Sequence, residues 1–410
     1  MHAIELLIPL RNTEQAAITQ RLDALQHAPL QAFSASIQAF LAAFADHILR
    51  DPAMRAAPEL MALAYWFRPA ALQALLARFQ HLGELGLLRP RGVAFHVAPA
   101  NVDSVFVYSW FLSLLCGNRN IVRLSRRENP QRDALLGILT ELLARPEHAA
   151  IANANVVLAY ERDNEISTAL SARCNLRVVW GGDATVKYMR SLPLPPLATE
   201  LVFPNRASWA LIHAENVNQT SAETLTQMAG AFYNDTFWFA QQACSSPRAL
   251  LWIGTPEQVQ AAQSRFWPTV KQEIARRNMQ DEPTQLAARL VAAHLAATEG
   301  GVILEGSLTD WPLRLSAQRF NATMRDGHCG YGLIYEIQRE SLDNSISLFE
   351  ACDQTVAYWG FEREALTRWA LMLPDRAVDR IVPLGQALRF ADRWDGHDLL
   401  LAFSRLVMIE

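Results

Sequence analysis

The spacing of hydrophobic positions changes along the chain, and each change predicts a different kind of element. Between residues 13 and 90, apolar side chains such as Leu22, Leu25, Phe33 and Ile37 recur at helical spacing. This pattern predicts a helical N-terminal region. Prolines interrupt the region repeatedly, so we expect several helices rather than one long helix.

From residue 92, short apolar runs alternate with amphipathic segments, which predicts strands that alternate with helices. The predicted strands cover residues 92–99, 120–124, 155–160, 176–180 and 207–212, and the predicted helices cover residues 104–116, 132–145 and 163–173. Such alternation is typical of a parallel, doubly wound sheet. The expected fold class is therefore α/β with a Rossmann-like domain that ends near residue 214.

The strand at residues 176–180 leads into Gly181 and Gly182, and a helix then begins with Asp183, Ala184 and Thr185. Backbone N–H groups at a helix N-terminus favour an anion, and glycine lets a ligand approach the backbone. The junction is therefore a candidate phosphate site for a dinucleotide. An ordinary connection from strand to helix has the same pattern, because no full G-x-G-x-x-G motif is present.

A single cysteine, Cys244, lies where the period changes again. Apolar positions from Leu225 to Phe239 recur at helical spacing, and Arg248 to Ile253 form a short apolar run after a Ser-Ser-Pro turn. A thiol at such a corner can lie near backbone N–H groups that stabilise its thiolate. The alternative is a small buried hydrophobic side chain, which is the commoner role of a cysteine.

Composition narrows the class of protein. The chain has 410 residues, of which 51% are hydrophobic and 19% are charged, and its net charge is -4. These values predict a globular protein of two or three domains that does not bind nucleic acid. Five cysteines without paired spacing favour a reducing, cytoplasmic compartment and argue against a disulfide framework or a metal site. The longest apolar run, residues 105–116, is too short to span a bilayer.

Three runs, GVAFHVAPANVDSVFVYSWFLSLLCGNRNIVRLS, VVWGGDATV and QQACSSP, occur in this order. They resemble the aldehyde dehydrogenase superfamily, and most closely its acyl-CoA reductase branch of the LuxC type. The later runs HCGYGLIYEI, DQTVAYWG, DRIVPLG and RWDGHDLLLAFSR are similar to the same branch. The resemblance implies an aldehyde-dehydrogenase-like fold with a helical region at 1–90, an NADP-binding domain at 91–214 and a catalytic domain at 215–385. A C-terminal segment, 386–410, would return to the active-site or oligomerisation side.

The resemblance also assigns roles to single residues. Cys244 matches the acyl-accepting nucleophile, and Asn101 matches the asparagine whose amide helps to form the oxyanion hole. Cofactor-binding positions are expected at Arg123, which replaces a lysine of the family, at Ser125 and on the turn formed by Gly181, Gly182, Asp183 and Thr185.

One departure from the family bears on the choice of cofactor. After Ser125, relatives that prefer NAD have an acidic residue, whereas this chain has Arg126 and Arg127. An arginine at this point can pair with a 2′-phosphate, which favours NADPH. The alternative is that Arg126 and Arg127 form an ordinary solvated surface pair.

A second departure concerns the general base. Aldehyde-oxidising relatives have a Glu-Leu-Gly-Gly run whose glutamate activates water. Here Glu200-Leu201 is followed by Val202 and Phe203, so the turn that aims the glutamate is altered. Glu200 is a candidate acid/base, and the alternative is a surface carboxylate.

The function that the resemblance implies is NADPH-dependent reduction of a long-chain acyl-CoA or other acyl thioester to the aldehyde, through an acyl-enzyme on Cys244. A homo-oligomer is expected, and an acyl-protein synthetase is a possible partner. Two alternatives stay open. One is an aldehyde dehydrogenase that oxidises an aldehyde to the acid, and the other is a non-catalytic dinucleotide-binding protein.

Overall fold

The computed structural model describes residues 4–9, 11–25, 30–99, 104–127, 129–279 and 281–409. It divides into two compact units. Unit 1 consists of Met1–Asn205 and Phe390–Glu410, and unit 2 consists of Arg206–Arg389. The helical N-terminal region and the C-terminal segment therefore belong to the same unit as the predicted cofactor domain. The division falls at residue 205 instead of near 214, because the strand at 207–213 pairs within the second sheet.

Unit 1 is built on a six-stranded sheet with the order β1-β5-β4-β3-β6-β7, in which only β1 is antiparallel to its neighbour. The strands are β1 (Glu5–Ile8), β3 (Val93–Val97), β4 (Arg119–Leu124), β5 (Asn155–Ala159), β6 (Leu176–Trp180) and β7 (Thr199–Phe203). Strands β3, β5 and β6 are buried at every position, as expected for a parallel sheet covered on both faces. The four predicted inner strands are confirmed, whereas the edge strands β1 and β7 were not predicted.

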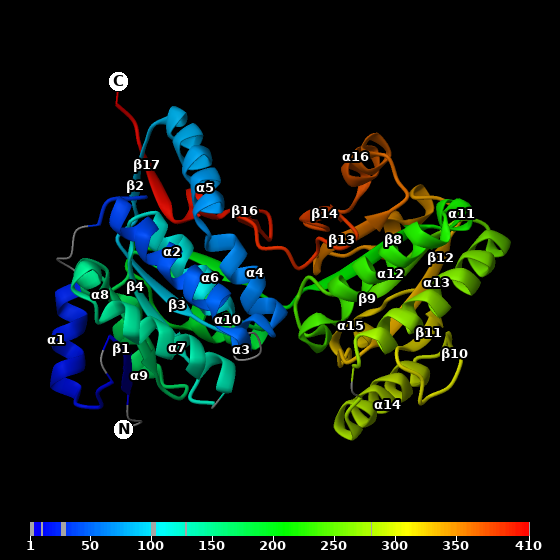
Figure 1. Ribbon diagram of the computed structural model, residues 1–410, viewed down its shortest axis with the longest axis horizontal. Helices are drawn as coiled ribbons and strands as arrows, with labels where there is room; N and C mark the ends of the chain where they lie inside the picture. The colour runs from blue at the N-terminus through cyan, green and yellow to red at the C-terminus, as the bar shows by residue number, and fades with distance from the viewer. Residues whose placement is uncertain are drawn as a thin grey trace. The chain divides into compact units, whose positions relative to one another are not determined.

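Helices cover both faces of this sheet. They are α1 (Gln15–Leu25), α2 (Ala35–Arg50), α3 (Pro52–Arg55), α4 (Pro58–Phe67), α5 (Pro69–Leu82), α6 (Ser104–Leu115), α7 (Pro130–Leu143), α8 (Ala149–Asn153), α9 (Asn164–Ala172) and α10 (Asp183–Ser191). Apolar residues of α2, α4, α6 and α7 share one core with one face of the sheet, and Figure 1 shows these helices grouped together. Helices α1, α9 and α10 share a second core with the opposite face.

The C-terminal segment completes unit 1. It contains β15 (Arg393–Trp394), β16 (His397–Asp398), α17 (Leu399–Ala402) and β17 (Ser404–Val407). Strand β17 pairs with β2 (Leu87–Pro90), and the Asn118 side-chain amide donates to the carbonyl of Phe403 at 2.8 Å. Arg78 of α5 forms ion pairs with Asp392 and Asp398.

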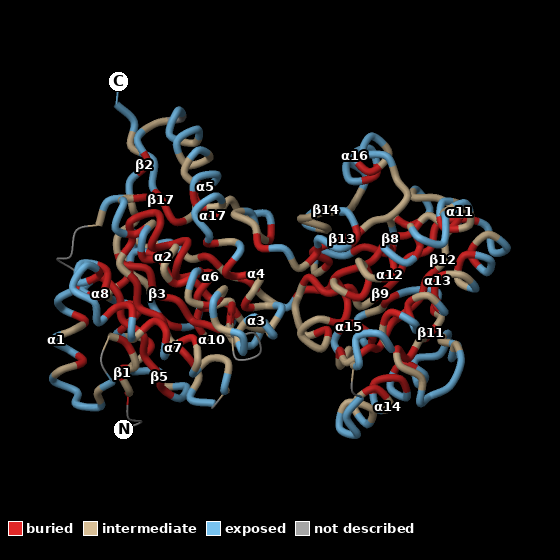
Figure 2. Tube along the Cα trace, viewed as in Figure 1, coloured by how far each residue is buried: buried red, intermediate tan, exposed pale blue. Residues whose placement is uncertain are grey.

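Unit 2 contains a seven-stranded sheet with the order β10-β11-β12-β9-β8-β13-β14, in which only β10 is antiparallel to its neighbour. The strands are β8 (Ala207–His213), β9 (Pro247–Ile253), β10 (Val302–Glu305), β11 (Leu313–Ala317), β12 (Leu333–Arg339), β13 (Asp353–Trp359) and β14 (Arg380–Pro383). Figure 2 shows that the tube is buried along the central strands of both sheets and exposed along the outer sides of the helices.

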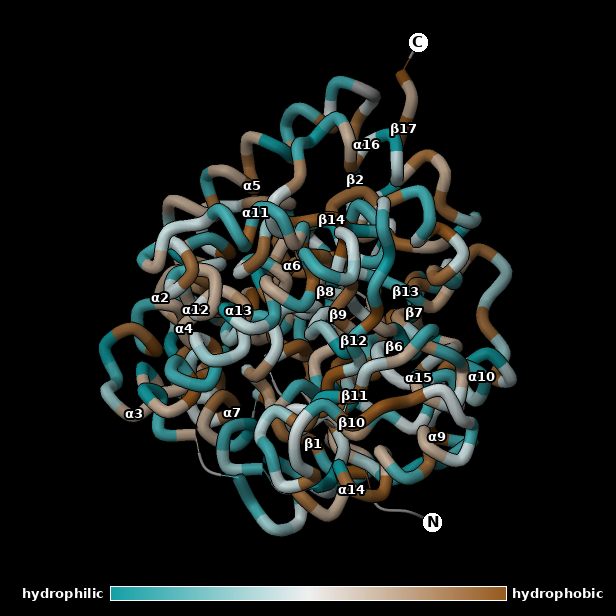
Figure 3. The backbone as a smooth tube through the Cα atoms, turned by 90° about the vertical axis from the view of Figure 1, so that its right-hand side faces the viewer, coloured by the Kyte–Doolittle hydropathy of each residue, from teal (hydrophilic) through white to brown (hydrophobic). Residues whose placement is uncertain are grey.

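The helices of unit 2 also lie on both faces of their sheet. They are α11 (Ala214–Gln219), α12 (Ala222–Phe237), α13 (Pro256–Arg276), α14 (Pro283–Thr298), α15 (Ala322–Asp326) and α16 (Arg363–Met372). Helices α12 and α13 pack on one face, and α14 and α16 pack on the other. Hydrophilic and hydrophobic segments alternate along many of these helices (Figure 3), as expected for helices with one buried side.

Among the described residues, no single helix is long and apolar enough to cross a membrane, although the bent pair α4 and α5 matches such a span in length and composition.

Candidate active site

The chain before Cys244 has an unusual backbone. Helix α12 ends at Phe237, and Phe239, Ala240 and Gln241 then have positive φ angles of 54°, 50° and 63°. The left-handed region costs a residue with a side chain roughly 1–2 kcal/mol. Such strain persists only where surrounding contacts determine the conformation, and it is concentrated at functional sites.

Two glutamines fix this segment. The buried Gln241 side chain donates to the carbonyls of Pro247 and Leu333 at 2.7 and 3.0 Å and accepts from the N–H of Gly332 at 2.9 Å. Gln242 donates to the carbonyl of Cys329 at 2.7 Å. The cysteine segment is thereby joined to strand β9 and to the loop before β12.

The loop before β12 approaches the cysteine segment so closely that only glycine fits. Gly330 has a φ of 77°, and a Cβ atom there would lie 2.9 Å from the Ala240 carbonyl and 2.3 Å from the Gln242 amide nitrogen. The N–H of Tyr331 donates to the same Ala240 carbonyl at 2.9 Å. The HCGYG run found in the sequence therefore packs against the cysteine segment and hydrogen-bonds to it.

Cys244 itself lies in the turn that follows. The Ser246 N–H donates to the Ala243 carbonyl at 3.0 Å, and the Ser208 hydroxyl of β8 donates to the Cys244 carbonyl at 2.7 Å. The Cys244 residue is partly exposed. The predicted corner between helix α12 and strand β9 is therefore present, with a strained segment inserted between the two elements.

Burial acts on the thiols of the other four cysteines. Burial raises the thiol pKa of Cys116 and of Cys174 to about 12 and that of Cys329 to about 11, and it also raises the pKa of Cys352. A thiolate is the reactive form of cysteine, so burial disfavours the reactive form of these four thiols.

The sheet of unit 1 has a topological switch point at its carboxyl edge. The helices that follow β3 and β4 lie on one face, and those that follow β5 and β6 lie on the other. In open α/β sheets, ligands bind beyond the carboxyl ends of the strands at such a point.

A cavity of about 180 Å³ lies at this edge. Its lining includes Arg123 and Thr185, which the sequence singled out, together with Tyr160, Arg162 and Tyr188, which it did not. The Arg123 guanidinium donates to the Tyr160 carbonyl at 3.0 Å, and the Arg162 guanidinium carbon lies 3.7 Å from the centre of the Tyr188 ring. Two guanidinium groups at this edge suit a nucleotide, because they can pair with phosphate.

The glycine turn borders the same edge. Gly182 is the N-cap of α10, and the Asp183 carboxylate accepts from the N–H of Asn205 at 3.1 Å. A Cβ atom on Gly182 would lie 2.9 Å from the Asn205 side-chain oxygen. The N-terminal end of α10 lies beside the cavity, because Thr185 of its first turn lines it. The residues present fit a dinucleotide.

Ser125, Arg126 and Arg127 lie outside the cavity that contains Arg123. Ser125 and Arg127 line a small hollow with residues of α6 and α7, and the Ser125 hydroxyl accepts from the N–H of Arg127 at 3.1 Å. The side chains of Arg126 and Arg127 are exposed. Neither arginine lines the cavity that contains Arg123 and Arg162.

Two predicted catalytic residues have different outcomes. Asn101 lies outside the described residues. Glu200 lies on edge strand β7, where one oxygen accepts from the buried Arg177 at 2.6 and 2.9 Å and the other accepts from Arg190 at 2.9 Å. Both carboxylate oxygens are thus used in ion pairs that join β6, β7 and α10, which are the contacts of a structural residue.

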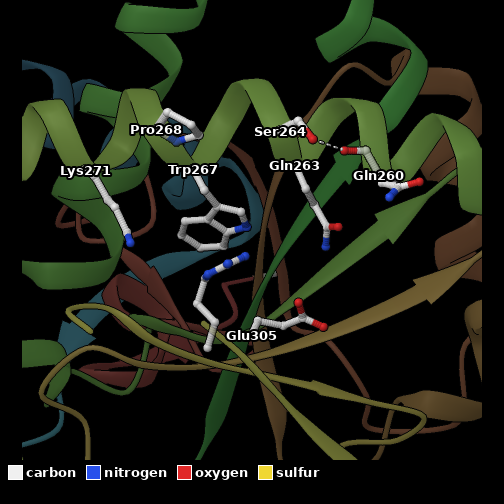
Figure 4. A pocket seen from close by; sticks show the side chains of 8 residues that line it. Gln260, Gln263, Ser264, Trp267, Pro268, Lys271 and Glu305 are labelled. Carbon is white, nitrogen blue, oxygen red and sulfur yellow. Dashed lines mark hydrogen bonds between the residues drawn. The ribbon is translucent and has the colours of Figure 1, made fainter. Parts of the chain in front are cut away.

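A further cavity, of about 370 Å³, lies in unit 2 between α13 and strands β10 and β11. Figure 4 shows Gln263, Trp267 and Lys271 pointing from α13 into it, with Glu305 opposite. Its cations are already paired, because Arg314 contacts Glu336 at 2.9 Å and Lys271 contacts Asp310 at 3.3 Å. The cavity lining contains no cysteine, and its Ser264 hydroxyl is bonded to the carbonyl of Gln260 at 2.8 Å.

Comparison with known proteins identifies the family of the chain. The sequence model of the acyl-CoA reductase (LuxC) family matches residues 44–408. A long-chain acyl-protein thioester reductase from Aliivibrio fischeri is 24% identical over 167 residues, which are 40% of this chain and 33% of that protein. The chain thus spans about a third of that relative's length.

Solved structures establish the fold. An NAD-dependent benzaldehyde dehydrogenase from Corynebacterium glutamicum has a TM-score of 0.66 at 13% identity, with 97% of this chain and 90% of that chain covered. Aldehyde dehydrogenase 21 from Physcomitrella patens has a TM-score of 0.68 at 12% identity, with 93% and 85% covered. The expected aldehyde-dehydrogenase-like fold is confirmed.

Proposed function

The chain belongs to the acyl-CoA reductase (LuxC) family, and on that premise we propose that it reduces a long-chain acyl thioester to the aldehyde through an acyl-enzyme on Cys244. The observation that supports this role is the contrast among the five thiols. Burial raises the thiol pKa of the other four, and Cys244 alone follows the strained segment Phe239–Gln241, which Gln241 and Gln242 hold by hydrogen bonds.

The first chemical step is the transfer of the acyl group to the enzyme. The Cys244 thiolate attacks the thioester carbonyl, a tetrahedral intermediate forms, and the donor thiol departs as its thiolate. The Cys244 backbone N–H and the Asn101 amide are the proposed donors to the oxyanion. The bonds of Gln241 and Ser208 hold the nucleophile in place during this exchange.

The second step needs a dinucleotide. We assign its binding to the cavity that contains Arg123 and Arg162 and to the turn at Gly181, Gly182, Asp183 and Thr185. When bound, it supplies the hydride that reduces the acyl group to the aldehyde. NADPH is the proposed form, because Arg162 and Arg123 offer two guanidinium groups to a phosphate at the cavity.

The contacts of Glu200 distinguish the reductase from an aldehyde-oxidising enzyme. Hydrolysis of the acyl-enzyme requires a base that activates water. Glu200 is held in two ion pairs on β7, so we leave it out of the mechanism. The acyl-enzyme is then expected to persist until hydride is available.

The test is intact-mass measurement after exposure to a long-chain acyl-CoA without NADPH. The wild-type protein should gain one acyl group and release about one equivalent of CoA, and NADPH should then yield aldehyde. Cys329→Ala is the matched control and should still be acylated, whereas Cys244→Ala should not. Unmodified wild-type protein with steady formation of carboxylic acid would refute the reductase and favour the oxidising enzyme.

A further inference from the structure

The first residue of interest beyond the nucleophile is Arg248, the second residue of β9. The chain reverses in the Ala243–Ser246 turn, so the start of β9 returns beside Cys244. The guanidinium of Arg248 interacts electrostatically with the thiols of both Cys244 and Cys329. It is therefore a positive charge within electrostatic range of the proposed acyl acceptor.

This guanidinium has no anionic partner among the described residues. No ion pair or side-chain hydrogen bond of Arg248 occurs in the described ranges, and its Nε atom is buried without a hydrogen-bond partner. Burial lowers the pKa of Arg248, and the two thiols counteract this effect. Arg248 as a whole is partly exposed, but its Nε atom lies out of water without a partner, so an anion that forms near this guanidinium is stabilised.

The neighbouring groups do not supply that anion. Cys329 stays protonated because burial raises its pKa to about 11, and burial raises the pKa of Tyr335 as well. Arg289 on α14 also acts on Cys329, but its guanidinium is ion-paired with Asp281.

His328 cannot take the proton from the cysteine. Its Nδ1 atom accepts from the N–H of Gly330 at 3.0 Å, and its Nε2 atom donates to the carbonyl of Leu333 at 3.0 Å. Burial, followed by the charge of Arg248, holds the His328 pKa well below its ordinary value. The neutral ring thus has no free lone pair, and activation by a histidine base is excluded at this position.

We propose that Arg248 is the positioning residue that holds Cys244 in its reactive thiolate form. The inference rests on the proposed role of Cys244 as nucleophile and assigns the activation of that nucleophile to a fixed charge rather than to a base. In the acylation step the thiolate already present attacks the carbonyl, so no proton has to be removed from the enzyme in that step.

The experiment measures the rate of Cys244 alkylation by iodoacetamide between pH 5 and pH 10, with peptide-level mass spectrometry to identify the modified cysteine. The wild-type midpoint should lie below the free-thiol value of about 8.5. Arg248→Gln should raise the midpoint by about one pH unit or more, and Arg248→Lys should restore most of the shift because it keeps the charge. Cys329→Ser is the control that should leave the midpoint near the wild-type value.

A purely structural role of Arg248 predicts a different result. Arg248→Gln would then lower the melting temperature but leave the midpoint unchanged, which overturns the proposal. A wild-type midpoint at or above about 8.5 overturns it without any variant, so the test survives if Arg248→Gln does not fold. Alkylation needs neither acyl donor nor NADPH. A failure of the Arg248 proposal in this assay can therefore be distinguished from a failure of the proposed function, which would appear as absence of the acyl adduct on Cys244.

Discussion

Asp235 gives a prediction whose magnitude follows from the structure. This residue of α12 is buried, and its carboxyl group accepts from the N–H of Gly385 at 2.5 Å and from the N–H of Ala387 at 2.8 Å. Burial raises the Asp235 pKa to about 7, although the two backbone donors and Arg380 oppose the rise. The carboxyl group therefore titrates near neutral pH in the folded protein.

The sign of the effect on stability follows from proton binding. Between pH 4 and pH 7 the unfolded chain has lost this proton while the folded protein still holds it, so the free energy of unfolding falls as the pH rises. One pH unit corresponds to about 1.36 kcal/mol, and the interval from 3.8 to about 7 therefore amounts to about 4 kcal/mol. The loss is complete only above the folded pKa.

The assay is urea unfolding of the full chain, followed by tryptophan fluorescence from pH 4 to pH 8, for the wild type and Asp235→Asn. The asparagine amide does not titrate. The variant loses one hydrogen bond from the 385–387 loop, which lowers the stability of the variant by an amount that does not change with pH. His96 and His328, whose pKa values are lowered by desolvation, change stability in the opposite direction but equally in both proteins. The difference between the wild type and the variant should fall by about 4 kcal/mol over this range. A difference that is constant with pH refutes the reasoning.

Three further variants test other assignments. Asn101→Ala should lower turnover by about 10²- to 10³-fold with an unchanged melting temperature, as expected for loss of one oxyanion donor; a lower melting temperature with normal turnover would show that Asn101 only caps a helix. Arg162→Glu should weaken NADPH binding by about tenfold more than NADH binding in a fluorescence titration, and equal losses would show that Arg162 only shapes the cavity. Glu200→Gln should destabilise unit 1 by about 3 kcal/mol, because Arg177 keeps a buried charge without its partner. The rate at which the acyl-enzyme is hydrolysed should not change, and a changed rate would show that Glu200 acts as a base.

The sequence predicted the four inner strands of the first sheet and strands β8 and β9 of the second, because buried parallel strands are continuous apolar runs. Leu176–Trp180 is buried at every position, and its carboxyl end meets two glycines. Edge strand β7 was missed because exposed and buried residues mix along it, and its Glu200 resembled part of a catalytic motif. Only the partner arginines, Arg177 at 2.6 Å and Arg190 at 2.9 Å, reveal the ion pairs, and neither is adjacent in sequence.

The candidate sites were predictable to different degrees. Cys244 could be found because a change of period isolates it, but the left-handed backbone at Phe239, Ala240 and Gln241 has no sequence signal, since none of these residues is glycine. Arg162 was recognisable in principle, because it follows the carboxyl end of β5. Tyr188 was not, because its position in the cavity depends on the packing of α10 against the sheet.

The return of the chain to unit 1 at Phe390 has a consequence for the order of folding. Strand β2 pairs with β17 of the C-terminal segment, which also holds one acceptor of the Asn118 amide and both carboxylates of Arg78. All of unit 2 must therefore be synthesised before unit 1 can close, and such distant pairings are slow to form. A chain that stopped at Arg389 would keep every residue of unit 2, Cys244 included, but would leave β2 with an unpaired edge and Arg78 without its two carboxylates.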